Sequence, residues 1–252
     1  MIILAILQAR VSSSRLPNKV LADLLGRPML ARQLERLVRS KKIDRLIVAT
    51  SDDVSDDAVE NICRAAEVRC FRGSLNDVLA RFAGAYEAFG PADHVVRLTG
   101  DCPLADPDHI DMVIERHLQS GSDYTTNAIQ PTWPDGLDVE VMTSAALKRA
   151  AVEARLPSER EHVTPFIHKQ PELFSVLHVK GETDLSNLRW TVDEPADLAF
   201  VREVYAKLYP VNPDFRTDDI LTLLHNCPEL AEINGDFQRN EGYAKSLKAD
   251  SL

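Results

Sequence analysis

Residues 2–19 read IILAILQARVSSSRLPNK, an aliphatic run followed at once by a basic, serine-rich loop. An uninterrupted aliphatic run of this length is typical of a strand buried on both faces, as in a parallel sheet. The loop therefore leaves the sheet at the carboxyl end of this strand, the edge at which open α/β sheets bind ligands. This stretch predicts an α/β fold with a site at the loop.

Short apolar runs continue to alternate with amphipathic stretches of helical length through the first half of the chain. Such alternation predicts a mostly parallel sheet flanked by helices. Ser55 is the expected N-cap of the second helix. We expect strands at residues 2–7, 46–50, 68–71 and 93–98, and helices at residues 28–40, 55–67, 75–89 and 108–120.

The second half of the chain has a more mixed pattern. Residues 137–141 alternate between polar and apolar side chains, as a half-buried strand does. Residues beyond 234 are polar and contain few apolar side chains. We expect one domain over residues 1–233 and a polar C-terminal tail over residues 234–252. The further expected elements are strands at 137–141, 174–179 and 188–192, and helices at 144–154, from about 158 and from about 194.

Composition limits the class of protein. The chain has 252 residues and a net charge of −10, which argues against a nucleic-acid binder. Four cysteines without C-x-x-C spacing indicate reduced thiols. The apolar run at the start is too short to span a bilayer and has no basic residue before it. We expect a soluble, cytoplasmic protein with no membrane partner.

The basic loop is the first candidate site. Residues 9–45 contain ten Lys or Arg and three Asp or Glu in an otherwise acidic chain. Arg10, Arg15 and Lys19 suit phosphate oxygens, and the small serines between them allow backbone N–H groups to approach an anion. The loop lacks the P-loop arrangement. It is either an anion site or a solvated basic surface.

Two aspartates follow expected strands and form the second candidate site. Asp101 comes after residues 93–98 and a glycine, and Asp193 comes after residues 188–192. Each is followed closely by a proline. Carboxylates at strand ends are suitable ligands for Mg²⁺, which binds few protein oxygens and takes the rest from substrate phosphates. For Asp193 the alternative is a helix cap.

Several stretches resemble the CMP-sugar cytidylyltransferases, the family of the acylneuraminate and 3-deoxy-manno-octulosonate enzymes. The resemblance is strongest to the branch that contains spore coat polysaccharide biosynthesis protein F, and it extends from residue 2 to about 247. The motifs that carry it are QARVSSSRLPNK at 8–19, GSLNDVLAR at 73–81, LTGDCPL at 98–104, DGLDVE at 135–140, REHVTP at 160–165, WTVDEPADL at 190–198 and NEGY at 240–243.

This resemblance implies a glycosyltransferase-A-like nucleotidyltransferase that uses CTP and Mg²⁺ and forms a homodimer. Arg10, Lys19, Asp101 and Asp193 would be catalytic, and the two aspartates would bind the metal. Asn18 stands where the family usually has glycine, and asparagine tolerates a positive φ if the loop needs one. The nucleotide-binding residues implied by position are Leu7, Gln8, Ala9, Arg10, Ser12, Arg15, Lys19, Gly73, Asp77, Arg81 and Thr99.

The acceptor side is less defined by the sequence. Asp138 and Glu140 share one face of the expected strand at 137–141, where they would contact the acceptor or lie on a solvent-facing edge with Asp135-Gly136 as its turn. His162 is either a general base or a helix N-terminal residue that contacts the acceptor or only the fold. The acceptor-binding residues implied by position are Asp135, Asp138, Glu140, Arg160 and His162.

The expected reaction is transfer of CMP from CTP to a nonulosonic or ulosonic acid, with release of pyrophosphate. Related cytidylyltransferases use phosphonates or phosphorylated alcohols instead. A glycosyltransferase would usually carry a D-x-D metal motif, whereas Asp101-Cys102 is followed by proline. A non-catalytic nucleotide-binding protein would have no need to retain both metal carboxylates and all three loop cations.

Overall fold

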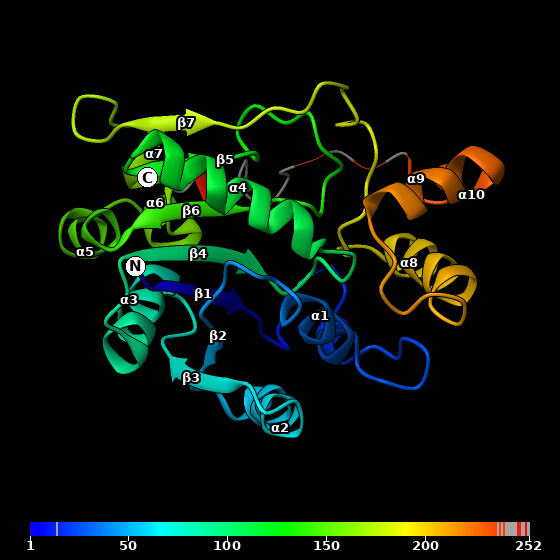
Figure 1. Ribbon diagram of the computed structural model, residues 1–252. Helices are drawn as coiled ribbons and strands as arrows, with labels where there is room; N and C mark the ends of the chain where they lie inside the picture. The colour runs from blue at the N-terminus through cyan, green and yellow to red at the C-terminus, as the bar shows by residue number, and fades with distance from the viewer. Residues whose placement is uncertain (14, 236, 238, 240–245, 248–249, 251–252) are drawn as a thin grey trace.

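A single sheet organises the molecule, which is described here from a computed structural model that covers residues 1–13, 15–235, 237, 239, 246–247 and 250. Its strands are β1 (Ile3–Gln8), β2 (Arg45–Ser51), β3 (Arg69–Gly73), β4 (His94–Thr99), β5 (Tyr124–Thr126), β6 (Glu140–Thr143) and β7 (Val176–His178). They lie in the order β3-β2-β1-β4-β6-β5-β7 (Figure 1).

Strand direction divides the sheet into two parts. β1, β2, β3 and β4 are parallel, β6 is antiparallel to both β4 and β5, and β7 is parallel to β5. The expected α/β fold, mostly parallel with a mixed second half, is confirmed. The side chains of Ile3 to Leu7 in β1 are at most 5% exposed, because helices cover both faces of the central strands.

Alternate residues of β1 enter two different cores. On one face, Ile3, Ala5 and Leu7 pack with α1 (Met29–Leu37), α2 (Asp57–Ala65) and α4 (Pro107–Ser120). On the other face, Leu4 and Ile6 pack with α3 (Val78–Phe89) and α5 (Ser144–Glu153). The short helices α6 (Pro157–His162) and α7 (Pro165–His168) contact α3 and α5 respectively.

A third core lies beyond the carboxyl ends of β1 and β4. It is formed by α8 (Pro195–Leu208), α9 (Thr217–Asn226) and α10 (Glu229–Glu232), which lie together at one end of the sheet in Figure 1. Side chains of these helices pack on Leu24, Leu104, Leu137 and Trp190. This helical group closes the end of the sheet where the expected site residues leave their strands.

The second helix starts later than the sequence predicts. Residues Val54–Asp56 form the 3₁₀ turn η2, and α2 begins at Asp57. The side chain of Asp53 accepts a hydrogen bond from the backbone N–H of Ser55 at 2.8 Å and so caps this turn. The prediction that Ser55 is the N-cap is wrong, because Ser55 lies inside the turn.

Two expected strands are changed by side-chain contacts. Residues 188–192 form no strand; a single bridge joins Arg189 to Asp135, and the fully buried Trp190 packs in the helical third core instead. The strand expected from residue 137 begins only at Glu140. The Asn127 side chain accepts from Val139 N–H at 2.8 Å, so a side chain takes the place of a neighbouring strand.

Most of the elements that the sequence did not predict are short. β5 has three residues, and η1 (Lys19–Leu21), α7 and α10 have three or four. Such lengths are too short for a periodic pattern to identify. The longer α9 was also missed. Among the described residues, no helix combines the length and apolar character needed to cross a membrane.

Candidate active site

The loop after β1 is held by one buried carboxylate. Asp56, which is fully buried, accepts hydrogen bonds from Val11 N–H at 2.6 Å and from Ser51 N–H at 3.0 Å, and so ties the loop to the end of β2. Further along, Asn18 N–H donates to the Val11 carbonyl at 3.1 Å, and Asn18 has a φ of 62°. This position does require a positive φ, which asparagine tolerates.

Lys19 lies at the centre of the site. Its Nζ donates to Asp193 Oδ1 at 2.8 Å, to the Val192 carbonyl at 2.8 Å and to Asp101 Oδ2 at 3.2 Å. Burial alone would lower the pKa of Lys19, but the two carboxylates outweigh it and raise this pKa. Burial would raise the pKa of Asp101, and Lys19 instead holds it below its usual value. The structure therefore brings both expected metal carboxylates to one cation.

Asp193 is contacted by three cations. Besides Lys19, Arg15 Nη2 lies 2.8 Å from Asp193 Oδ2, and Arg189 Nη2 lies 3.4 Å from the same oxygen. The helix-cap alternative for Asp193 is wrong, because Glu194 is the N-cap of α8. Asp197 instead accepts the backbone N–H groups of Asp193 at 2.9 Å and Glu194 at 2.8 Å.

The segment at residues 73–81 brings a buried arginine beside the loop. Arg81 Nη1 donates to the carbonyl of Ser74 at 2.6 Å. Burial, with Arg10 nearby, lowers the pKa of Arg81 to about 10. Arg10 itself makes no hydrogen bond or ion pair to another described residue. A Cβ on Gly73 would lie 2.9 Å from the Phe71 ring, so this close approach of backbone and ring needs glycine.

The remaining nucleotide candidates differ in what they can offer. The side chains of Leu7 and Ala9 are buried in the core, whereas Ser12 is exposed. Gln8 Oε1 accepts from Arg97 Nε at 3.2 Å. The hydroxyl of Thr99 lies 3.3 Å from Cys102 Sγ. Ser14 and the motif at residues 240–243 lie outside the described residues.

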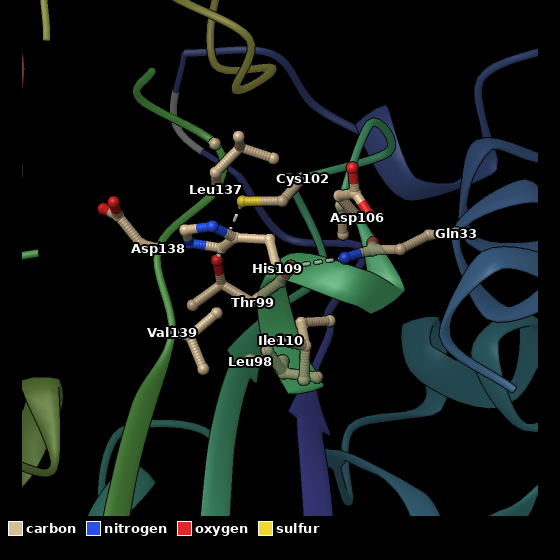
Figure 2. A pocket seen from close by; sticks show the side chains of 12 residues that line it. Gln33, Leu98, Thr99, Cys102, Asp106, His109, Ile110, Leu137, Asp138 and Val139 are labelled. Carbon is tan, nitrogen blue, oxygen red and sulfur yellow. Dashed lines mark hydrogen bonds between the residues drawn. The ribbon is translucent and has the colours of Figure 1, made fainter. Parts of the chain in front are cut away.

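A small cavity adjoins the end of β4. It has a volume of about 10 Å³, close to the space that one water molecule needs. Gln33, Thr99, Cys102 and His109 are among its lining residues, and Figure 2 shows the Asp138 carboxylate pointing away from it. Gln33 Nε2 donates to the Thr99 carbonyl at 2.7 Å, while its Oε1 is buried without a hydrogen-bond partner among the described residues.

Two of the three expected acceptor carboxylates each bind an arginine outside the sheet. Asp135 Oδ2 accepts from Arg189 Nη1 at 3.0 Å. Asp138 Oδ1 accepts from Arg239 Nη2. Burial raises the pKa of Asp138 to about 7, with Arg239 opposing this rise. Both carboxylates are partly exposed.

Glu140 is engaged by its own network. It accepts from Tyr124 Oη at 2.5 Å, from Thr164 Oγ1 at 2.5 Å, and from Arg97. Burial would raise the pKa of Glu140, but Arg97 and the hydroxyl groups hold it below the usual range. Because β6 lies between β4 and β5, the solvent-facing edge-strand alternative is wrong.

Arg160 and His162 both lie in the short α6, and His162 is its last residue, so the helix N-terminal alternative for His162 is wrong. Arg160 contacts Asp77, with Nε at 3.0 Å and Nη2 at 2.5 Å from Oδ2, so an expected acceptor residue pairs with an expected nucleotide residue. Asp77 also caps α3. His162 Nε2 lies 2.9 Å from Ser246 Oγ. Burial, with Arg97 and Arg10 nearby, lowers the pKa of His162.

The donor set fits a magnesium ion held through few protein ligands. No group of three or more His, Cys, Asp or Glu side chains suited to a metal occurs in the described part of the chain. Asp101 and Asp193 nonetheless converge on one position, now taken by the Lys19 ammonium. One or two carboxylates are sufficient for Mg²⁺ when substrate phosphates supply the other oxygens.

Sequence reasoning missed the residues that hold this site together. Asp56 anchors the loop, Arg97 joins Gln8 to Glu140, and Arg189 joins Asp135 to Asp197. All are charged side chains with little exposed surface. One signal was available in the sequence. Asp197, the second aspartate of the DEPAD stretch at 193–197, stands at the N3 position of a helix, from which a side chain can reach back to the N-cap residue.

Comparison with known proteins gives a consistent result. The family model described as "Cytidylyltransferase" matches residues 4–207. The spore coat polysaccharide biosynthesis protein SpsF of Bacillus subtilis is 36% identical over 238 residues, which cover 91% of this chain and 96% of that protein. A 3-deoxy-manno-octulosonate cytidylyltransferase of Anaeromyxobacter sp. strain K is 30% identical over 202 residues, 73% of this chain and 82% of that one.

The same fold occurs in a solved structure. A cytidylyltransferase from Leptospira borgpetersenii superposes with a TM-score of 0.88 at 31% sequence identity. The match covers 95% of this chain and all of that chain.

Proposed function

This chain belongs to the cytidylyltransferase family, and we propose that it transfers CMP from CTP to a sugar acid of the nonulosonic or ulosonic type. The single observation that carries the proposal is the convergence of Asp101 and Asp193 on Lys19, beside the basic loop that follows β1. This arrangement offers cations to a triphosphate and two carboxylates to a metal at the same edge of the sheet.

The proposed reaction requires the site to neutralise negative charge. An acceptor hydroxyl oxygen forms a bond to the α-phosphorus of CTP, the bond from that phosphorus to the bridging oxygen breaks, and pyrophosphate leaves. Phosphoryl and nucleotidyl transfers depend mainly on positioning and on neutralising negative charge. Mg²⁺, held by Asp101 and Asp193 when bound, would offset charge on the phosphate oxygens.

The protein's own cations bind and orient the triphosphate. Arg10 has no partner among the described residues and is free to take phosphate oxygens. Lys19 and Arg15 hold the carboxylates of Asp101 and Asp193 through ion pairs. If these carboxylates held Mg²⁺, both cations would be available to the triphosphate.

The acceptor side is proposed to use Asp135 and Asp138. Oδ2 of Asp138 has no hydrogen-bond partner among the described residues, and Oδ1 of Asp135 has only an ion pair with Arg239 at 3.9 Å, which suits acceptor hydroxyl groups. Glu140 and Arg160 are occupied by internal partners and act by shaping the site. His162, whose pKa is lowered, stays neutral near pH 7 and is able to accept a proton from the acceptor hydroxyl.

The sugar-acid class is supported by the relatives. One of them is named for 3-deoxy-manno-octulosonate, and another for the polysaccharide of a spore coat. A cytoplasmic location and a homodimer remain predictions. Sedimentation of the purified protein at micromolar concentration tests the dimer, and a single species of monomer mass would refute it.

Pyrophosphate release tests the proposed function. CTP and MgCl₂ are mixed with the protein and with one acceptor at a time, using sialic, legionaminic, pseudaminic and 3-deoxy-manno-octulosonic acids beside an aminoalkyl phosphonate. We expect release with one sugar acid and none without acceptor, and CTP preferred over ATP and GTP. Turnover of the phosphonate alone would overturn the sugar-acid assignment and leave CTP use intact.

A further inference from the structure

Several described residues of the C-terminal segment, residues 234–252, contact candidate site residues. At its start, Asn234 Nδ2 donates to the carbonyl of Arg189 and to Asp197 Oδ1, both at 2.9 Å. Near its end, Asp250 accepts from the backbone N–H of Ser158 in α6 at 2.8 Å. The helix α10, which precedes the segment, and α6 are well separated in Figure 1. Its described residues therefore bridge two distant parts of the molecule.

Between these ends the segment meets both groups of acceptor candidates. Arg239 binds Asp138 through Nη2 and donates to the carbonyl of Trp133 through Nη1 at 3.1 Å. Ser246 Oγ lies 2.9 Å from His162 Nε2 and 2.7 Å from a carboxylate oxygen of Glu161. Asp138 precedes β6 and His162 ends α6, and described residues of the same segment contact each of them.

The Arg239 contact leaves half of the Asp138 carboxylate available. Arg239 takes Oδ1, while Oδ2 has no hydrogen-bond partner in the described part of the chain. The side chain of Asp138 is 27% exposed and that of Arg239 only 14%. Arg239 is therefore the covered member of the pair, and Asp138 is the one that a ligand can reach.

Nearby charge makes this cation important. Burial, and after it Asp135, Glu140 and Asp101, disfavour the charged form of Asp138, and Arg239 is the cation that opposes them. Lys19 and Arg189 are already shared among other carboxylates. Without Arg239, Asp138 would be a poorly compensated carboxylate with no fixed orientation.

We propose that Arg239 is a positioning residue of the acceptor subsite. Arg239 holds Oδ1 of Asp138 and so presents Oδ2 to a hydroxyl group of a polyhydroxylated acceptor. This inference rests on the proposed function, because it assigns a role within the acceptor half of that reaction. It concerns the acceptor and leaves the binding of CTP unaffected.

A double-mutant cycle on the contact tests the inference. The variants are Arg239→Gln, Arg239→Lys, Asp138→Asn and the double variant Arg239→Gln/Asp138→Asn. The matched control is Arg149→Gln, which removes an arginine from an exposed pair with Glu153 on α5. Pyrophosphate release is measured with the sugar acid that the wild type uses, and CTP affinity is measured by calorimetry with Mg²⁺. Thermal unfolding of every variant reports its folding.

We expect Arg239→Gln to raise the acceptor KM by about 10- to 100-fold, the effect of losing a hydrogen bond to a charged group, with kcat changed by less than about threefold. Arg239→Lys should recover part of the loss. The double variant should be no worse than the poorer single variant, because both changes break one contact. The CTP affinity of each variant should match that of the wild type. The Arg149→Gln control should also match the wild type in its acceptor KM.

The outcomes separate the inference from the function on which it rests. A wild-type protein that releases no pyrophosphate with any sugar acid would overturn the proposed function and this inference with it. An active wild type whose acceptor KM is unchanged by Arg239→Gln would overturn this inference alone. Arg239 would serve only the fold if Arg239→Gln weakened CTP binding and acceptor binding equally. The same conclusion would follow if the loss in the double variant were the product of the losses in the two single variants.

Discussion

The nucleotide side and the acceptor side of the site are assembled in different ways. On the nucleotide side, Lys19 and Asp101 follow β1 and β4, which are neighbouring parallel strands. On the acceptor side, Asp138 is held by Arg239, which is 101 residues away and lies outside the sheet.

The difference shows which part of a site the strand order determines. Parallel neighbours end at the same edge of a sheet, so the sheet itself brings their following residues together. The acceptor side has no such frame. Asp135 and Asp138 depend on Arg189, on the approach to α8, and on Arg239, in the C-terminal segment. We therefore expect substitutions on the two sides to have different consequences.

The largest effect should come from breaking the link between the two sides. Arg189→Met should lower the free energy of unfolding by about 3–5 kcal/mol, because it leaves the fully buried Asp197 without its charged partner. Urea unfolding at pH 7 measures the loss. Arg149→Met, in an exposed helix pair, should cost less than about 1 kcal/mol. Equal small losses in both variants would contradict the proposed role of Arg189.

Asp101→Asn should affect catalysis rather than folding. The amide keeps the shape of the side chain but loses the charge that would bind a metal, and turnover should fall by about 100- to 1,000-fold. CTP should still bind in a calorimetric titration. Asp108→Asn is the matched control, since that carboxylate is exposed and pairs with Arg216. Near-normal turnover of Asp101→Asn would remove Asp101 from the reaction.

Acid should weaken the fold near the acceptor side. Burial lowers the pKa of His109 to about 4, against 6.5 in the unfolded chain. The unfolded state therefore takes up a proton that the folded state does not, and this contribution is present above pH 6.5 and lost as the pH falls towards 4. The loss at pH 5 should be about 2 kcal/mol.

Urea unfolding of the wild type and His109→Gln at pH 7 and pH 5 isolates this contribution. His109 lies 3.0 Å from the Asn127 amide and packs edge-on against Trp133, so the variant also loses packing at both pH values. Only the change in the free energy of unfolding between pH 7 and pH 5 reports the protonation. If His109→Gln showed the same change as the wild type, His109 would not be the group responsible.

The smallest expected effect concerns the loop after β1. Asn18 has a φ of 62°, so Asn18→Ala should cost about 1 kcal/mol while Asn18→Gly should be close to neutral. Thermal unfolding of the two variants compares them directly. Equal stability of both would mean that the loop relaxes to a negative φ.

The contrast between the two sides also explains what the sequence could predict. The aliphatic run before Gln8 and the apolar residues before Asp101 identified two strand ends, whereas the contacts of Lys19 with Asp101 and Asp193 were not predicted. Residues 188–192 have the same apolar character, but Trp190 packs among helices, and no local pattern distinguishes that outcome. Local periodicity indicates that a segment is buried, but it does not indicate which elements the segment packs against.

The acceptor side was less predictable for a related reason. Asp138 and Glu140 alternate with apolar residues as strand residues do. Before Glu140, however, the backbone bonds to the Asn127 side chain and not to a neighbouring strand, and the Glu140 carboxylate is bound by Arg97. These are single side-chain contacts across long stretches of chain. The metal assignment of Asp101 and Asp193, the role of Arg10 and the acceptor roles remain predictions.

The central claim is that Asp101 and Asp193 hold one cation, which is Lys19 without ligand and Mg²⁺ with CTP. Calorimetric titration of CTP with and without MgCl₂, in the wild type and in Asp193→Asn, tests it most directly. We predict that Mg²⁺ strengthens CTP binding to the wild type at least tenfold and that Asp193→Asn loses most of this gain. The same affinity with and without Mg²⁺ in the wild type, or a full gain in Asp193→Asn, would contradict the shared site.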